Sequence, residues 1–318
     1  MNSTFSCIKK LSQFLELSEE NRALVEKAHP FRLNVPFRLA EKMRKNCLED
    51  PLFLQFVPLQ KRPSLPVSFS KEPLQEALCS PKKKLLHKYF GRALLLVSAN
   101  CAMHCRYCFR QNFPYEKEVE DFSEEFAYIA ANPSIQEVIL SGGDPLSASD
   151  SRLDQIFSHL HKISHVKKIR IHTRFPIGFP SRISRKLCSI FARSIKQVVF
   201  VLHINHPLEW GEDLREKLLL IQRLGIPVFT QSVLLKGVND AFSTLFSLYT
   251  QLSDAGIVPY YLHHLDPVEG SERFFVTENV GTHLIEKLRE HLPGYAVPTY
   301  VKEIPGSASK VPIFPCAG

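Results

Sequence analysis

Ala93-Leu-Leu-Leu-Val-Ser98-Ala-Asn-Cys101-Ala-Met-His-Cys105-Arg-Tyr-Cys108 is the most informative stretch of this chain. A short apolar run typical of a β-strand leads there directly into three cysteines. Three thiolates at C-x3-C-x2-C spacing can hold three irons of a [4Fe–4S] cluster, and the fourth iron then has no protein ligand nearby. Because four cysteines hold the clusters that serve electron transfer, this loop predicts chemistry at an open iron.

A structural zinc site and three free thiols are the alternatives. Structural zinc takes four ligands, and His104 could supply the fourth. His104 adjoins Cys105, however, and adjacent residues rarely direct their side chains at one metal. The sequence has no second C-x2-C pair, so it favours the iron–sulfur cluster. The remaining cysteines are interpreted as packing residues or inert thiols: Cys7, Cys47, Cys79, Cys188 and Cys316.

Length and composition set limits on the class of protein. A chain of 318 residues suits one large α/β domain with an appendage, and 44% hydrophobic with 23% charged residues is ordinary for a globular enzyme. No apolar run is long enough to span a membrane and the N-terminus lacks the order of a signal peptide, so we expect a cytoplasmic protein with no membrane partner. The net charge of +8 could attract nucleic acid, but no RNA-binding aromatic motif accompanies it. We therefore expect no nucleic-acid partner.

The order of predicted elements indicates the fold. Residues 1–86 carry helix-like patterns, such as 18–28 and 37–47, broken by prolines, which predicts an N-terminal helical segment packed on a main domain at 87–318. Beyond residue 92, β-type runs alternate with helical stretches, as in βα units of a parallel sheet. Six such strands fit a partial TIM-like (β/α)6 barrel in the α/β class. The predicted strands are 93–98, 137–141, 168–172, 197–203, 227–234 and 258–264.

Polar or glycine-rich residues follow each of these strands. The cysteine loop follows the first strand and Ser141-Gly-Gly-Asp-Pro145 follows the second. Active-site residues of such barrels lie at the C-terminal ends of the strands, so the pattern predicts an enzyme. The later strand ends carry His172-Thr-Arg174, His203-Ile-Asn-His-Pro207, Gln231-Ser-Val-Leu-Leu-Lys-Gly-Val-Asn-Asp240 and His263-His-Leu-Asp266.

The cysteine spacing and the Gly-Gly-Asp-Pro segment together resemble the radical S-adenosylmethionine (SAM) superfamily. The resemblance implies that the open iron binds the methionine part of SAM and reduces SAM to a 5′-deoxyadenosyl radical. It also implies that Gly142, Gly143 and Asp144 belong to the segment that holds the SAM amino group, with the glycines allowing close backbone approach.

Further blocks resemble the lysine 2,3-aminomutases, in order over roughly residues 70–313. This family uses pyridoxal phosphate (PLP) as well as SAM, and a lysine amine forms a Schiff base with PLP. The matching lysine here is Lys310. The blocks are Leu86-His-Lys-Tyr-Phe-Gly-Arg92, Cys105-Arg-Tyr-Cys-Phe-Arg110, Leu140-Ser-Gly-Gly-Asp-Pro-Leu146, Gln231 to Asp240, Tyr260-Tyr-Leu-His-His-Leu-Asp266 and Pro298-Thr-Tyr-Val-Lys-Glu-Ile-Pro-Gly-Ser-Ala-Ser-Lys310.

The resemblance also assigns the two ends of a lysine substrate. Arg110 would bind the carboxylate, for which a bidentate guanidinium fork is suited. Asp266 and Glu303 would bind the distal ammonium; Glu303 is a departure, because free-standing lysine aminomutases carry Asp there. Lys88 and Arg92 match basic positions that can hold the PLP phosphate, or they form an ordinary basic strand end. Tyr107, which replaces the usual histidine, is assigned no role beyond packing against the loop.

The resemblance therefore implies a radical SAM, PLP-dependent isomerase that converts L-lysine to (R)-β-lysine. Cys-Arg-Tyr-Cys-Phe-Arg110 followed by Phe113-Pro-Tyr115 is most similar to members that serve the modification of elongation factor P. The implied partners are lysine, an electron donor for the cluster, and elongation factor P or its modification ligase. An aminomutase for another amino acid, such as glutamate, and a catalytically silent Fe–S scaffold protein are the alternatives. Two distal acids argue against the first, and the complete cysteine set with Arg110 and Lys310 argues against the second.

Overall fold

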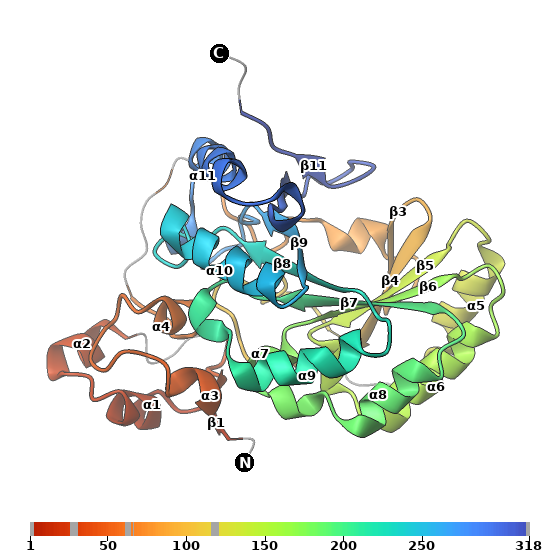
Figure 1. Ribbon diagram of the computed structural model, residues 1–318, viewed down its shortest axis with the longest axis horizontal. Helices are drawn as coiled ribbons and strands as arrows, with labels where there is room; N and C mark the ends of the chain where they lie inside the picture. Colours follow the sequence, from red (N-terminus) through yellow and green to blue (C-terminus); the bar gives the residue numbers. More distant parts are fainter. Residues whose placement is uncertain (1–2, 26–30, 61–64, 66, 116–120, 316–318) are drawn as a thin grey trace.

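The computed structural model describes residues 3–25, 31–60, 65, 67–115 and 121–315. Its centre is a nine-stranded sheet in the order β11-β10-β9-β8-β7-β6-β5-β4-β3 (Figure 1). The six predicted strands are confirmed to within one residue at each end, and each pairs in parallel with its neighbour. They are β4 (Arg92–Ser98), β5 (Glu137–Gly142), β6 (Lys168–Thr173), β7 (Gln197–His203), β8 (Val228–Val233) and β9 (Val258–His263).

Three further strands extend this sheet. Antiparallel β3 (Leu85–Tyr89) lies beside β4, so the predicted boundary between residues 86 and 87 falls inside a strand. On the other side β10 (Thr299–Lys302) pairs in parallel with β9, and β11 (Val311–Pro312) pairs antiparallel with β10. Within the described chain, β3 and β11 are the sheet edges and do not pair with each other. The sheet is therefore an open, partial barrel, as predicted.

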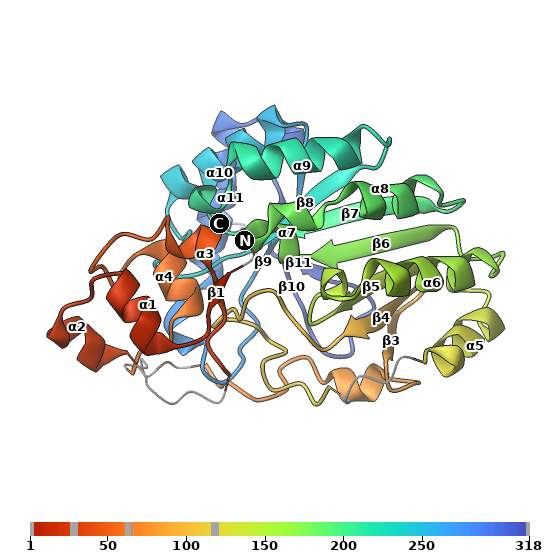
Figure 2. The same ribbon diagram turned by 90° about the horizontal axis from the view of Figure 1, so that it is seen from below.

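Helices connect successive parallel strands and cover the outer face of the sheet (Figures 1 and 2). In α6 (Asp150–His161), Ser149 accepts a hydrogen bond from the Arg152 amide at the N-terminus. The same helix buries Leu153, Ile156, Phe157 and Leu160 at the spacing of one helical face. The other long helices are α5 (Ser123–Ala131), α8 (Arg185–Ala192), α9 (Glu212–Gln222), α10 (Phe242–Asp254) and α11 (Glu278–His291).

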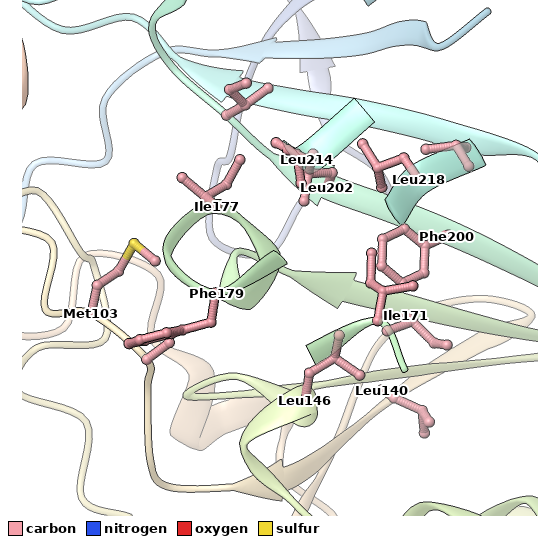
Figure 3. Packing of buried hydrophobic residues seen from close by; sticks show 14 of the residues in the cluster. Met103, Leu140, Leu146, Ile171, Ile177, Phe179, Phe200, Leu202, Leu214 and Leu218 are labelled. Carbon is pink, nitrogen blue, oxygen red and sulfur yellow. The ribbon is translucent and has the colours of Figure 1, made fainter. Parts of the chain in front are cut away.

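The main core lies between these helices and the sheet. Figure 3 shows Phe200 and Leu202 of β7 next to Leu218 and Leu214 of α9, and all four side chains are almost fully buried. Burial of this kind supplies most of the free energy that favours folding. The core fixes the strands, and the strands in turn fix the positions of the loops at their C-terminal ends. None of the described helices is long and apolar enough to cross a membrane.

The N-terminal segment is less helical than predicted. It contains α1 (Ile8–Phe14), α2 (Glu19–Leu24), α3 (Phe37–Ala40), α4 (Pro51–Phe56) and the small sheet of β1 (Thr4–Phe5) with β2 (Val35–Pro36). The prediction of a helix over 37–47 was wrong beyond Ala40, because the backbone turns there and Asn46 takes the left-handed conformation. Residues 26–28 of the predicted helix at 18–28 lie outside the described residues. Both views place α1 to α4 together at one end of the molecule, remote from α5 (Figures 1 and 2).

Candidate functional site

One cavity of about 300 Å³ brings together all the residues predicted for the site. It opens among the loops that follow the parallel strands, where the barrel rule places active sites. The predicted residues on its wall are Lys88, Arg92, Cys101, Cys105, Cys108, Arg110, Gly142, Gly143, Asp144, Asp266, Glu303 and Lys310. Cys79, which the sequence analysis treated as a scattered thiol, also lines it. Cys316 lies outside the described residues.

The N-terminal segment holds the cysteine loop in place. Asn34 donates from Nδ2 to the carbonyl oxygens of Cys101 (3.2 Å) and Ala102 (3.1 Å). The guanidinium of Arg106, which is 3% exposed, donates to the carbonyl oxygens of Phe31, Arg32 and Phe56 at 2.7, 2.8 and 2.9 Å. These bonds satisfy backbone groups of an irregular segment and fix the shape of the loop.

His104 points toward the N-terminal segment. Its ring stacks on Phe31 with centroids 4.5 Å apart, and its Nδ1 donates to the carbonyl of Arg32 at 2.8 Å. This arrangement argues against His104 as the fourth ligand of a zinc site. Among the described residues, no three Cys, His, Asp or Glu side chains surround a single point at which one metal ion could bind. A [4Fe–4S] cluster does not require such a point, because each cysteine binds a different iron.

The three thiols are buried in the cavity wall. Burial raises the pKa of Cys101, Cys105 and Cys108, the last to about 12. Ligand thiols must be deprotonated, and a bound metal supplies the positive charge that deprotonates them. Arg174 contributes a positive charge from the end of β6, because its Nη1 lies 2.9 Å from the Cys105 sulfur.

Sequence reasoning missed the network that holds Arg174. Its Nη2 donates to Gln55 of α4 at 2.8 Å and to Glu209, a fully buried residue, at 3.0 Å. Tyr107, which was assigned only a packing role, is 4% exposed and accepts a hydrogen bond from Asn205 Nδ2 at 2.7 Å. Tyr107 lies inside the cysteine motif, and Arg174 and Asn205 lie in the segments that follow predicted strands, but Gln55 and Glu209 belong to no motif.

Close packing of the backbone requires glycine at the end of β5 and directly after it. Gly142 has φ of +120°, and a Cβ on it would lie 2.4 Å from the carbonyl oxygen of Ser98. A Cβ on Gly143 would lie 2.6 Å from the carbonyl oxygen of Asn100. Both glycines therefore allow the strand-end segment to pack against the start of the cysteine loop. Their predicted approach to a cofactor stays a prediction.

Asp144 joins the ends of β5 and β6. Its Oδ1 accepts from the amide of Leu146 (2.9 Å) and the hydroxyl of Thr173 (2.7 Å). Its Oδ2 accepts from the amides of Arg174 (2.7 Å) and Phe175 (2.9 Å). Burial raises the pKa of Asp144 to about 6, although these four hydrogen bonds favour the charged form. Both oxygens are engaged by the chain, and direct contact of Asp144 with a cofactor stays a prediction.

Arg110 pairs with an acid that the sequence analysis did not identify. Its Nε and Nη2 donate to the two carboxylate oxygens of Glu76 at 2.8 and 2.7 Å, which is a bidentate ion pair. Its Nη1 faces the carbonyl of Gly142 at 3.2 Å and the hydroxyl of Ser141 at 3.4 Å. Glu76 begins the 3-10 helix η1 (Glu76–Cys79), which lies outside the recognised motifs.

Glu303 connects both edges of the sheet. Its Oε1 accepts from Lys88 Nζ at 2.8 Å and from the Tyr89 hydroxyl, both on β3, and its Oε2 accepts from Lys310 Nζ. Burial acts to raise the pKa of Glu303, but Lys310, Lys88 and Tyr89 outweigh it and bring the pKa to about 2. The carboxylate is therefore ionised and fixes the amine of Lys310 in the cavity.

Asp266 is a different kind of acid. In the described part of the chain, its carboxylate makes no hydrogen bond or ion pair. Burial raises the pKa of Asp266 to about 7, with Lys310 opposing the rise and Glu303 adding to it. A carboxylate without a partner in a cavity is suited to receive a cation from a bound molecule.

Two other groups are available to a bound molecule. The Nε2 of His172 is buried and has no hydrogen-bond partner among the described residues, and burial lowers the pKa of this imidazole well below its usual range. Arg92 lies over the ring of Tyr89 at 4.8 Å and makes no ion pair with a described residue. With Lys88, it gives the cavity cations that could hold an anionic phosphate.

Comparisons with known proteins identify the family. Residues 91–178 match the family described as "4Fe-4S single cluster domain". A curated protein of Escherichia coli K12 named L-lysine 2,3-aminomutase is 40% identical over 309 residues, covering 96% of this chain and 90% of its own. Proteins of the same name from Buchnera aphidicola and Clostridium subterminale are 41% and 32% identical, covering 88% and 97% of this chain and 84% and 75% of their own.

A solved structure is similar in fold. The crystal structure of a radical SAM methyltransferase from Sphaerobacter thermophilus superposes with a TM-score of 0.50 at 18% identity. The match covers 69% of this chain and 68% of that one. At this level of identity the similarity concerns the fold alone.

Proposed function

Because this chain belongs to the lysine 2,3-aminomutase family, as a radical SAM aminomutase, we propose that it converts L-lysine to (R)-β-lysine with PLP as an additional cofactor. One observation carries the proposal. A single cavity contains three cysteines at cluster spacing, the guanidinium of Arg110, the free carboxylate of Asp266 and the amine of Lys310. A lysine substrate requires this combination of charges, an anion binder for its carboxylate and an anion for its distal ammonium.

Cys101, Cys105 and Cys108 would hold the [4Fe–4S] cluster. With SAM bound, the cluster, once reduced, would supply the radical chemistry that removes a hydrogen atom from the β-carbon of lysine. The chain contributes a fixed loop, braced by Asn34 and Arg106, and the positive charge of Arg174 beside the Cys105 sulfur. Rigid support of this kind keeps reacting atoms at a productive distance.

Lys310, Lys88, Arg92 and His172 fit a PLP site. PLP, when bound, carries the nitrogen that migrates from C2 to C3 of lysine. The amine of Lys310 is the nucleophile available to PLP, and Glu303 holds that amine in the cavity. Lys88 and Arg92 offer positive charge to a phosphate, and the unpartnered Nε2 of His172 can bond to a polar group of the cofactor.

Substrate lysine would bind by its two charged ends. Arg110 receives the carboxylate, and Asp266 with Glu303 receives the distal ammonium. The ammonium would favour the ionised form of Asp266 and so lower its raised pKa. A glutamate substrate would place a third carboxylate beside these two acids, which argues against an aminomutase for acidic amino acids.

We propose further that the product serves the modification of elongation factor P. The support for this role is a sequence resemblance. The runs Cys105-Arg-Tyr-Cys-Phe-Arg110 and Phe113-Pro-Tyr115 resemble those of family members that serve this modification. Mass spectrometry of elongation factor P from cells with and without the gene tests it. An unchanged mass of the factor would remove this assignment and leave the aminomutase proposal standing.

The decisive assay uses anaerobic protein reconstituted with iron, sulfide, SAM and PLP, a strong reductant, and lysine labelled with ¹⁵N at the α-amine. We expect β-lysine with the label on C3 and the R configuration. Reactions without SAM, and the Lys310→Ala variant, serve as controls. Protein that cleaves SAM but leaves lysine unchanged would contradict the proposal, and protein that does not cleave SAM would support the silent-scaffold alternative.

A further inference from the structure

Glu76 is the closest charged neighbour of Arg110, and no motif or assigned role includes it. Its carboxylate lies on the cavity wall and forms the bidentate pair with Arg110 at 2.7 and 2.8 Å. Both side chains are largely buried, with 14% of the Glu76 and 8% of the Arg110 side chain exposed. A buried pair with this geometry restricts the guanidinium far more than an exposed ion pair would.

The backbone before Glu76 supports a specific purpose for this turn. Gln75 has φ of +48° and ψ of 43°, a left-handed conformation that residues other than glycine rarely adopt. Leu74 is 7% exposed and anchors the segment, whereas Leu78 is 81% exposed. The unusual turn therefore does not serve to bury Leu78; it directs Glu76 into the cavity. Unfavourable backbone conformations persist where the surrounding structure requires them, and they concentrate at functional sites.

The pair determines which hydrogen atoms of Arg110 remain for a ligand. Arginine has five N–H donors, and Glu76 takes Nε and one donor of Nη2. The remaining donors are on Nη1 and the other side of Nη2, and they form the end of the fork. Nη1 donates to the carbonyl oxygen of Gly142 at 3.2 Å and to the hydroxyl of Ser141 at 3.4 Å, so a ligand at this end would share or replace these two hydrogen bonds. This end can donate to a second carboxylate in bidentate geometry.

We propose that Glu76 is a positioning residue for substrate recognition: it holds Arg110 so that the Nη1–Nη2 end of the guanidinium faces the carboxylate of the substrate. The inference rests on the proposed function of Arg110 as the carboxylate binder. Two other roles make different predictions. A purely structural ion pair would affect folding alone, and a competing carboxylate would weaken substrate binding.

The test compares Glu76→Gln with Glu72→Gln. Glu72 lies on the same segment, is exposed and is not part of the cavity wall, so its change removes the same charge without touching Arg110. We expect Glu76→Gln to raise the KM for lysine about tenfold or more, as is common when a supporting contact of a ligand-binding group is lost. The values of KM and kcat in Glu72→Gln should match the wild type.

A second substrate analogue identifies the group that Glu76 acts on. Lysinamide carries an amide in place of the carboxylate, and its inhibition constant should be the same in wild type and Glu76→Gln. Iron content, PLP content and SAM cleavage without lysine should also be unchanged. Glu76→Asp, which keeps the charge on a shorter side chain, should restore part of the affinity and serves in place of Glu76→Gln if that variant does not fold.

The outcomes separate the possible roles. An unchanged KM for lysine would show a purely structural pair, and a lowered KM would show that Glu76 competes with the substrate; either result overturns the inference. An equal loss for lysine and lysinamide would also overturn it, because the effect would then not act through the carboxylate. If wild-type protein with a full cluster and PLP did not act on lysine, the proposed function would fail independently of Glu76.

Discussion

Arg174 Nη1 lies 2.9 Å from the sulfur of Cys105, so the end of β6 places a permanent cation beside one of the three cysteines proposed to hold the cluster. Hydrogen bonds to cluster sulfurs influence the reduction potential. A donor that stabilises the sulfur charge favours the reduced, more negative cluster. We therefore expect Arg174, which follows β6, to raise the reduction potential of a cluster bound at Cys105.

Arg174→Gln should make the cluster harder to reduce. A charge-assisted hydrogen bond contributes about 1.5–3 kcal/mol, so for this one-electron couple we expect the potential to fall by at most about 65–130 mV. Redox titration followed by electron paramagnetic resonance measures the shift. The matched control is Arg193→Gln, which removes an exposed arginine paired with Asp154. Equal reduction potentials in Arg174→Gln and the wild type would show that Arg174 does not influence reduction of the cluster.

Each cluster cysteine should be indispensable. Changing Cys101, Cys105 or Cys108 to Ala removes the ligand of one iron, and we expect bound iron to fall well below the roughly four atoms of an intact cluster, with SAM cleavage lost. Cys79→Ala is the matched control, because this thiol lines the same cavity outside the motif. Iron analysis and assay of 5′-deoxyadenosine provide the measurement. Normal cleavage in the motif variants would refute the assignment.

Lys310 should be the site of covalent attachment of PLP. Its amine is on the cavity wall and is held by Glu303. Borohydride treatment followed by peptide mapping should place a pyridoxyl label on Lys310. Lys302→Ala is a suitable control, because that lysine pairs with Glu278 and does not line the cavity. A label found on another lysine would contradict the assignment of Lys310 as the lysine that binds PLP.

If Asp266 binds the distal ammonium as proposed, substrate binding should depend on pH. Burial raises its pKa to about 7, and an incoming ammonium requires the ionised form. The apparent affinity for lysine should therefore rise with pH up to about 7 and then level off. In Asp266→Asn this dependence should disappear, and kcat/KM should fall by the equivalent of about 2–5 kcal/mol, the usual cost of removing one partner of a buried charge pair. Profiles that stay parallel in both proteins would exclude Asp266 as the ammonium ligand.

The same carboxyl gives a stability effect of known sign. Its folded pKa lies above the unfolded value, so its contribution to stability is full at low pH and is lost as the pH rises through about 7. Asp266→Asn should therefore stabilise the fold against denaturant more at about pH 8 than at about pH 5. Asp254→Asn, at an exposed position, is the control. Denaturant unfolding at the two pH values measures this difference without a catalytic assay. An equal change in stability at both pH values would contradict the raised pKa of Asp266.

The sequence predicted the six parallel strands because each is an apolar run bounded by turns at βα spacing. It did not predict β10 and β11, which are four and two residues long and depend on pairing with distant strands. The helix over 37–47 was wrong for a similar reason, since local periodicity does not report where tertiary contacts turn the chain.

For the site, motif residues were predictable and their supporting residues were not. Cys101 and Lys310 stand in recognisable contexts, and both line the cavity. Glu76 and Gln55 reach the site only through folding, from segments with no motif, and their partners Arg110 and Arg174 lie far along the chain. Sequence spacing carries no information about such pairs.

The most direct test of the account follows one hydrogen atom. Lysine deuterated at C3 is incubated anaerobically with the reduced, SAM- and PLP-loaded protein, and the 5′-carbon of the adenosyl group is then examined by mass spectrometry. Our account predicts deuterium there, because the cavity would place the β-carbon of lysine beside the adenosyl radical, and predicts none with lysine deuterated at C6. Cleavage of SAM without transfer of deuterium from C3 would contradict it.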